Sequence, residues 1–226
     1  MRTGRSGERN ETEMTGVPLE ELGWDPVWAY HAAEVDEPGL VAGRLTTVDR
    51  GQVTLATANG SIAAEWRFPV PIPDAHEGVM PAVGDWGLID GDASTSRLSY
   101  LLPRRTLLAR GVGKGSRVTQ PLAANVDLVM VVTGLDRDFS VRRIERFLAL
   151  ARSGGVRAIV VLSKSDLCSD LERAELEARR VAPGQTVVAV SAVDGRGLSR
   201  LTTELGPGRT AVLVGSSGVG KSTLIN

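Results

Sequence analysis

The chain has 226 residues, of which 42% are hydrophobic and 23% charged, and its formal net charge is −1. This composition is typical of a globular protein with one large or two small domains, and the near-neutral charge excludes a global field that attracts nucleic acids or membranes. The single cysteine, Cys168, excludes an intrachain disulfide and favours a reducing compartment. The apolar runs are too short to cross a bilayer and the N-terminus lacks a signal-peptide core, so we expect a cytoplasmic protein without membrane contact.

Residues 1–36 are predicted to form an N-terminal extension. Residues 1–16 are polar and contain several glutamates, a composition typical of a disordered segment. Residues 19–30 carry Leu22, Trp24 and Trp28, and this apolar content predicts a short helix or a packed arm. No function is assigned to this segment.

Residues 37–102 are predicted to form a small β-barrel. Short β-rich runs alternate there with turn signals, and the Asn59-Gly60 step is a strong hairpin signal. The expected strands are residues 41–48, 53–57, 62–68, 83–89 and 98–102. Five short strands favour a barrel of the OB type, with an SH3-like barrel as the alternative. Many such barrels bind oligonucleotides, but this inference rests on fold analogy alone.

Residues 103–119 are predicted to be a basic connector. No acidic residue occurs between Ala93 and Val126, and six cations in that stretch give a local charge of +6. The stretch is either a solvated linker or a flexible connector that faces phosphates, and the lack of offsetting carboxylates favours RNA. The candidate RNA-binding residues are Arg104, Arg105, Arg110, Lys114 and Arg117.

Residues 120–226 alternate between strand and helix patterns, which indicates a parallel sheet covered by helices. Ser140 is expected to cap the first helix, which Gly154-Gly155 ends. Buried strands are predicted at residues 126–133, 157–162, 186–190 and 210–214. Helices are predicted at residues 140–152, 170–181, 198–205 and from 221 onward.

The last predicted strand leads into the pattern G-x-x-x-x-G-K-S. Glycines let backbone N–H groups curl around phosphate oxygens, and the following helix adds a positive dipole. Lys221, the candidate catalytic residue, is expected to reach the β and γ phosphates, and Ser222 to ligate Mg²⁺. The motif indicates a nucleoside triphosphate without specifying the base. The candidate phosphate-binding residues are Gly215, Ser216, Ser217, Gly218, Val219, Gly220, Lys221, Ser222 and Thr223.

Two further stretches follow predicted strands and suggest which base is bound. Ser163-Lys164-Ser165-Asp166 ends in an aspartate that can accept hydrogen bonds from the N1–H and the amino group of guanine, a donor pair that adenine lacks. The aliphatic part of Lys164 can lie along the base. Ser191-Ala192 follows the next strand, where a backbone N–H can meet the guanine O6. Because the carboxyl ends of parallel strands share one edge, these stretches are expected to converge with the phosphate loop.

In chain order, a base motif, a second base motif and then a phosphate loop form a circular permutation of the usual GTPase. Preceded by a small barrel, the chain resembles the ribosome small-subunit-dependent GTPase A family. The matching stretches are residues 81–86, 102–105, 123–127, 135–140 and 215–226. The resemblance implies hydrolysis of GTP to GDP with Mg²⁺, stimulated by the small ribosomal subunit during its late maturation. It also implies the small ribosomal subunit and its rRNA as partners of a monomeric protein.

The chain departs from this family in two respects. Ser163 stands where the base motif usually begins with Asn or Thr, so we expect lower affinity with specificity retained through Asp166. The family's switch I, switch II and zinc-binding segments would follow residue 226, so we expect a fragment or a truncated product. Its hydrolysis should then be very weak, its phosphate-loop strand should be an exposed edge, and Zn²⁺ belongs only to the missing region.

Two other functions remain open from the residues alone. One is an RNA-binding module, formed by the barrel and the basic connector, with a vestigial nucleotide site. The other is a P-loop ATPase or kinase in which the S-K-S-D stretch is accidental.

Overall fold

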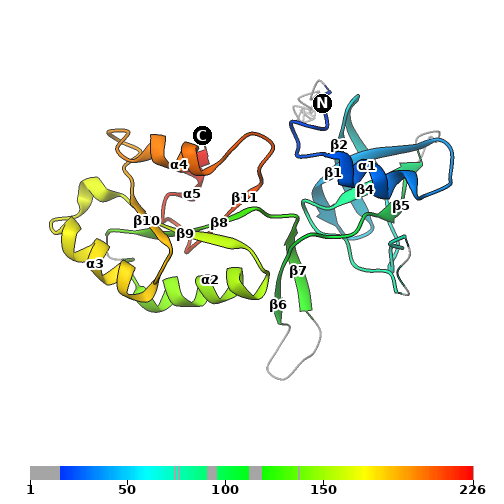
Figure 1. The fold of residues 1–226 in the computed structure, drawn as a ribbon. Coiled ribbons are helices and arrows are strands. Elements are labelled where there is room, and N and C mark those ends of the chain that lie inside the picture. The colour runs from blue at the N-terminus through cyan, green and yellow to red at the C-terminus, as the bar shows by residue number, and fades with distance from the viewer. Residues whose placement is uncertain are drawn as a thin grey trace, which may run out of the picture.

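The computed structural model describes residues 16–73, 75, 77–90, 96–111, 119–136 and 138–225. Figure 1 shows a β-barrel and an α/β sheet side by side, with a β-hairpin between them. The predicted disorder of residues 1–16 falls, apart from Gly16, outside the described residues. None of the helices in the described part of the chain is long and apolar enough to cross a membrane.

The N-terminal body is a closed barrel of five strands, counted over the described residues. Its strands follow the order β1-β2-β3-β5-β4, in which β4 closes on β1 and β3 runs parallel to β5. This closed Greek-key arrangement confirms the predicted OB-type barrel. The strands are β1 (Leu40–Asp49), β2 (Gln52–Thr57), β3 (Gly60–Glu65), β4 (Trp86–Asp90) and β5 (Arg97–Leu101).

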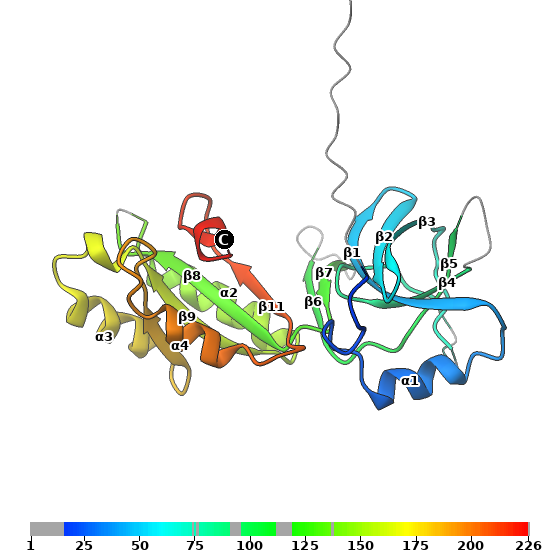
Figure 2. The same cartoon turned by 90° about the horizontal axis from the view of Figure 1, so that it is seen from above.

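The segment before the barrel contains both the short helix and the packed arm that were the two alternatives. Helix α1 (Pro26–Ala33) begins at Asp25, whose carboxylate accepts hydrogen bonds from the backbone N–H groups of Val27 and Trp28. The rings of Trp24 and Trp28 lie 4.8 and 6.3 Å from that of Trp86 on the barrel. Figure 2 shows α1 lying along the outside of the barrel.

The expectation of a flexible connector is wrong for most of its described residues. Strands β6 (Leu107–Gly111) and β7 (Thr119–Ala124) pair antiparallel. The hairpin packs against the end of the first helix of the α/β body, where a Cβ on Gly154 would come within 2.7 Å of the Leu108 side chain. Leu108 is 1% exposed within the core of that body. The described residues of the hairpin therefore pack against the α/β body, and Leu108 is part of its hydrophobic core.

A buried ion pair holds the barrel to the hairpin. Arg104 donates through two nitrogens to the two carboxylate oxygens of Asp85, each at 2.7 Å. Asp85 is fully buried and its side chain also accepts the backbone N–H of Ala82. Burial raises the pKa of the Asp85 carboxyl, and the hydrogen bond from Arg104 opposes that rise. Arg104 is therefore committed to the fold, because it compensates the buried carboxylate more strongly than the Ala82 N–H or the charge of Arg44 does.

The C-terminal body is a parallel sheet of four strands within the described residues, in the order β10-β9-β8-β11. The predicted parallel sheet is confirmed. Its strands are β8 (Leu128–Gly134), β9 (Arg157–Ser163), β10 (Thr186–Ala189) and β11 (Ala211–Val214). Its helices are α2 (Val141–Ser153), α3 (Leu171–Val181), α4 (Leu198–Glu204) and α5 (Lys221–Ile225).

The helices cover both faces of this sheet, as Figure 1 shows with α2 below and α4 above. Alternate residues of β8 serve the two faces, because successive side chains of a strand point in opposite directions. Val129 and Val131 pack in the core under α2 and α3, whereas Met130 and Val132 pack in the core under α4 and α5. A central strand that is buried on both faces explains the continuous apolar run in its sequence.

Three local expectations differ from the structure. Ser140 occupies the N-cap position of α2, but its side chain makes no capping hydrogen bond. The sequence analysis did not predict the 310 turn that Ser165–Leu167 forms after β9. Strand β11 is only half-buried along all four residues, because among the described strands it lies at the edge of the sheet and pairs with β8 alone. The edge position agrees with the expectation for the phosphate-loop strand, whereas its predicted burial does not.

The buried pair at the junction predicts a large difference between two aspartates. Asp85→Ala is expected to lower the free energy of unfolding by about 3–5 kcal/mol, because it leaves Arg104 without its counter-charge. Asp25→Ala removes a helix cap and a half-exposed pair with Arg105, and should cost only about 1 kcal/mol. Urea unfolding at neutral pH measures both variants. Equal losses would contradict the structural role of Asp85.

Candidate functional site

The carboxyl ends of the four parallel strands gather four loops at one edge of the sheet. The loop after β9 carries the predicted base motif, and the loop after β11 is the glycine-rich loop. The backbone N–H of Ser165 donates to Val190 O at 3.0 Å, so the loop after β9 is joined to the end of the next strand. The sheet therefore brings together all three stretches that the sequence singled out for nucleotide binding.

The glycine-rich loop owes its shape to specific glycines. A Cβ on Gly215 would lie 2.3 Å from Val132 O, so only glycine permits this close approach to β8. Gly218 and Gly220 have φ angles of +79° and +93°, in the left-handed region that favours glycine. Val219 between them is 1% exposed and anchors the loop in the core. Val219 therefore anchors the loop, and the glycines on either side of it allow the backbone to turn.

Lys221 and Ser222 begin helix α5 directly after the loop. The ammonium of Lys221 donates to Gly215 O at 3.0 Å and to Ser216 O at 2.6 Å, so the side chain folds back over the loop. Ser222 and Thr223 are exposed. The Ser222 hydroxyl has no hydrogen-bond partner within the described part of the chain, so it is available as an oxygen ligand, the donor type that Mg²⁺ prefers.

Ser163 fastens the base motif to the glycine-rich loop. Its buried hydroxyl lies 2.6 Å from Val219 O and 3.2 Å from Thr133 O. The side chain of Ser163 therefore faces the loop and not the edge where a base would lie. Asp166, three residues later, is exposed, and its carboxylate makes no hydrogen bond or ion pair with the described residues. Its acceptor oxygens are free to meet a ligand.

The sequence suggested Ser191 and Ala192 as the second base motif, and among the described residues only the N–H of Ala192 is available to a ligand. The Ser191 N–H donates to Arg196 O, and its hydroxyl accepts the N–H groups of Val193 and Asp194. Ser191 is therefore fully engaged in its own turn. Ala192 is exposed, and its N–H has no partner among the residues that the structure describes. Of the two, Ala192 is the residue whose N–H can receive a carbonyl oxygen.

The loop after β8 contributes charged side chains to which the sequence analysis assigned no role. Asp136 accepts a hydrogen bond from the ammonium of Lys164 at 2.6 Å, which lowers the pKa of the Asp136 carboxyl. Arg143 donates to Asp138 at 2.6 Å and to the hydroxyl of Ser216 in the glycine-rich loop. The signal that could have found them is the position of Asp136 and Asp138 directly after a buried parallel strand.

The candidate RNA-binding cations are mostly engaged in the fold. Arg104 is paired with Asp85, so its charge is already compensated within the fold, and its role in RNA binding remains a prediction. Arg105 pairs with Asp25 and lies 4.3 Å from the ring of Trp28, and its hydrogen bond lowers the pKa of Asp25 from 3.8 to about 2. Arg110 is exposed and donates to the side-chain oxygen of Gln120. Lys114 and Arg117 lie outside the described residues.

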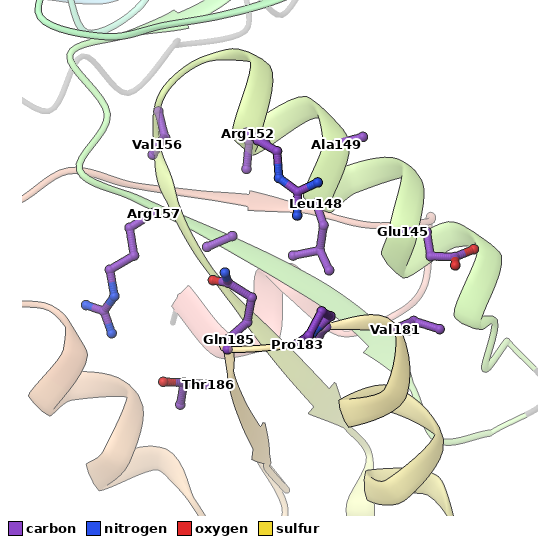
Figure 3. Close-up of a pocket in the computed structure, with 14 residues that line it drawn as sticks. Glu145, Leu148, Ala149, Arg152, Val156, Arg157, Val181, Pro183, Gln185 and Thr186 are labelled. Carbon is purple, nitrogen blue, oxygen red and sulfur yellow. The ribbon is translucent and has the colours of Figure 1, made fainter.

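A cavity of about 670 Å³ lies at the opposite edge of the sheet, near the amino ends of β9 and β10. Figure 3 shows Leu148, Arg152 and Pro183 around it, on α2 and on the loop before β10. None of the predicted nucleotide-binding residues lines this cavity. No group of three or more His, Cys, Asp or Glu side chains that could hold a metal occurs in the described part of the chain.

Comparisons with known proteins found a family model and several relatives that resemble this chain. The family model described as RsgA GTPase matches residues 101–226. A curated "Small ribosomal subunit biogenesis GTPase RsgA" from Opitutus terrae is 40% identical over 220 residues, which are 93% of this chain and 60% of that protein. The protein of the same name from Streptomyces coelicolor is 40% identical over 212 residues, covering 92% and 57% of the two chains. The chain thus spans about three fifths of the length of these relatives.

Two solved structures share the fold. The crystal structure of YjeQ from Thermotoga maritima has a TM-score of 0.62 at 25% identity, covering 83% of this chain and 64% of that one. The structure of YloQ, described as a circularly permuted GTPase, has a TM-score of 0.57 at 22% identity, covering 84% and 65%. The likeness to YloQ concerns the fold alone.

The contrast between two neighbouring serines supplies a test of the site geometry. Ser163→Ala removes the hydrogen bond to Val219 O and leaves a buried carbonyl unpaired, so it should lower the free energy of unfolding by about 1–3 kcal/mol. Ser165→Ala is the matched control, because the buried Ser165 hydroxyl has no partner within the described residues. That change should be neutral or stabilising. Urea unfolding measures both, and a larger loss in Ser165→Ala would contradict the geometry.

Proposed function

This chain belongs to the RsgA GTPase family, and from that premise we propose that it binds guanine nucleotides and acts in maturation of the small ribosomal subunit. One observation carries the proposal. The Ser163 hydroxyl ties the base motif to the glycine-rich loop through Val219 O at 2.6 Å, so the free carboxylate of Asp166 and the phosphate loop belong to one edge of one sheet. This arrangement favours a guanine nucleotide over the accidental S-K-S-D of an ATPase or kinase.

The proposed roles follow from the groups that remain available. Asp166 accepts the N1–H and the amino group of guanine, and the N–H of Ala192 donates to the guanine O6. Backbone N–H groups of residues 215–220 hold the phosphates, for which Lys221 exchanges its contacts with Gly215 O and Ser216 O. The exposed hydroxyl of Ser222 is the proposed ligand of Mg²⁺.

The reaction proposed for the whole protein is hydrolysis of GTP to GDP and phosphate. The curated relatives are named small ribosomal subunit biogenesis GTPases, and this chain covers 60% of the first of them. Lys221 offsets negative charge that develops on the transferring phosphate, and bound Mg²⁺ supplies further charge compensation. We expect residues 1–226 by themselves to hydrolyse GTP very slowly without the ribosomal subunit. The proposal places the protein in the cytoplasm, as a monomer.

Contact with the subunit's rRNA is a second proposal, and a face of the barrel supports it. Trp66 follows β3 and packs over the β1–β2 turn, where its indole N–H donates to Asp49 O. A hollow of about 130 Å³ beside it is lined by Trp66, Arg67, Arg97 and one carboxylate, that of Glu65. Both arginines are exposed and form no ion pair within the described residues.

We include Phe68 in the proposed face, because it follows Arg67 in the chain and has 67% of its surface exposed. Aromatic side chains beside free arginines suit single-stranded RNA, since bases stack on the rings while the cations meet phosphates. This face, formed by Trp66, Arg67, Phe68 and Arg97, is preferred to Arg104 as the proposed RNA contact. Arg110 remains a candidate.

Base selection is tested by Asp166→Asn. An amide can no longer accept two hydrogen bonds from guanine, so affinity for GDP should fall by about 100-fold or more, while affinity for xanthosine diphosphate should rise. Equilibrium titration with both nucleotides measures the exchange of preference. Glu172→Gln on α3 is the matched control, an exposed carboxylate whose loss should alter neither affinity. Unchanged GDP affinity in Asp166→Asn would contradict the proposed base site.

The RNA proposal is tested by Phe68→Ala. Loss of one stacking ring should weaken binding to single-stranded small-subunit rRNA by about 1–3 kcal/mol and leave GDP affinity unchanged. Tyr30→Ala on α1 removes a ring that is 60% exposed elsewhere, and serves as the control. Binding is measured by fluorescence anisotropy at several salt concentrations. Equal effects of the two changes would exclude this face as the contact.

A further inference from the structure

We propose that Asp136 is a positioning residue for guanine-nucleotide binding, because it fixes the ammonium of Lys164 beside the base site. The inference rests on the proposed function and adds the loop after β8 to the nucleotide site. Asp136 precedes Lys164 by 28 residues in the chain, and its carboxylate Oδ2 lies 2.6 Å from Lys164 Nζ. It would touch no part of the nucleotide itself, so its action runs through Lys164.

The backbone of Lys164 is held in an unusual conformation. Its φ of +58° lies in the left-handed region, which a lysine adopts only when its surroundings enforce it. The N–H of the next residue, Ser165, donates to Val190 O, and the N–H of Leu167 donates to Lys164 O. The start of the lysine side chain is therefore fixed, and its direction is set before any ligand arrives.

The carboxylate of Asp136 is equally well held. Its Oδ1 accepts the backbone N–H of Asp138 at 3.0 Å. A Cβ on Gly134 would lie 2.8 Å from that oxygen, so glycine leaves the room that the carboxylate occupies. The N–H of Leu135 donates to Ser163 O at 2.8 Å and joins the two loops at their roots. The pair is therefore formed between two anchored ends.

The ion pair has two consequences for a guanine nucleotide. A free lysine side chain loses rotamer entropy when it is immobilised, so a stem fixed beforehand reduces the entropy lost on binding. The pair also occupies the Lys164 ammonium, which otherwise has the carboxylate of Asp166 two residues away as an alternative partner. Asp166 makes no ion pair within the described residues and so keeps its acceptor oxygens for the base.

Asp138, the other carboxylate of this loop, does not compete with Asp136 for Lys164, because it has a partner of its own. Asp138 pairs with Arg143 at 2.6 Å, and Arg143 also donates to Ser216 Oγ. Asp138 therefore acts on the phosphate loop, whereas Asp136 acts on the base motif. The two carboxylates of one short loop give a matched pair of positions for a test.

A double-mutant cycle of Asp136→Asn and Lys164→Met tests the proposal on the full 226-residue chain. Each single change should accelerate release of a fluorescent GDP analogue about tenfold, because each removes the ion pair between Asp136 and Lys164. The double variant should release it no faster than either single variant. Stopped-flow displacement with excess GDP gives the rates. Lys164→Met keeps the aliphatic stem and removes only the ammonium, so its release rate still measures the loss of the ion pair if Asp136→Asn does not fold.

Asp138→Asn is the control, and its effect should add to that of Lys164→Met, because Asp138 does not contact Lys164. Additive effects of Asp136→Asn and Lys164→Met would overturn the proposal, since they would show that Asp136 merely shapes its loop. An unchanged release rate in folded Asp136→Asn would overturn it as well. Failure of the unaltered chain to bind the GDP analogue would instead refute the proposed function, so the two failures are distinguishable.

Discussion

A hydrogen bond between Ser163 and the carbonyl of Val219 joins parts of the chain that lie 56 residues apart, and the proposed nucleotide site depends on it. Val219 is anchored in the core beneath the glycine-rich loop, and Ser163 ends a central strand of the sheet. The contact holds the proposed base motif against the glycine-rich loop. A serine makes this contact because the two backbones are already close, so a short side chain reaches.

The parallel sheet supplies the closeness that this contact requires. Strands β8 and β9 are central and buried on both faces, so their carboxyl ends are held in fixed register. The loop after β8 then meets the base motif through Asp136, and Arg143 at the start of α2 joins Asp138 of that loop to the phosphate loop. Backbone N–H groups and loop side chains thus form the site at an open edge, while the 670 Å³ cavity lies at the other edge.

The arginines of this protein fall into two groups, those paired within the fold and those exposed on the surface, and their positions in the sequence do not distinguish the two. Arg104 compensates the buried Asp85 and fastens the barrel to the hairpin. Arg67 and Arg97 instead remain exposed beside Trp66 on the barrel surface. A cation on the surface attracts phosphate, whereas a cation with a buried partner has its charge already neutralised. The density of arginines along the chain therefore did not indicate which arginines are exposed and unpaired among the described residues.

The sequence by itself determined the barrel, the parallel sheet and the glycine-rich loop, because these follow from periodicity and turn residues within short windows. It also indicated Asp166 and Lys221 as parts of one site, because the carboxyl ends of parallel strands must share an edge. Only the tertiary structure decided which arginines are free, that residues 107–124 contain paired strands, and that Asp136 holds Lys164. These features depend on contacts between distant residues, which no local pattern records.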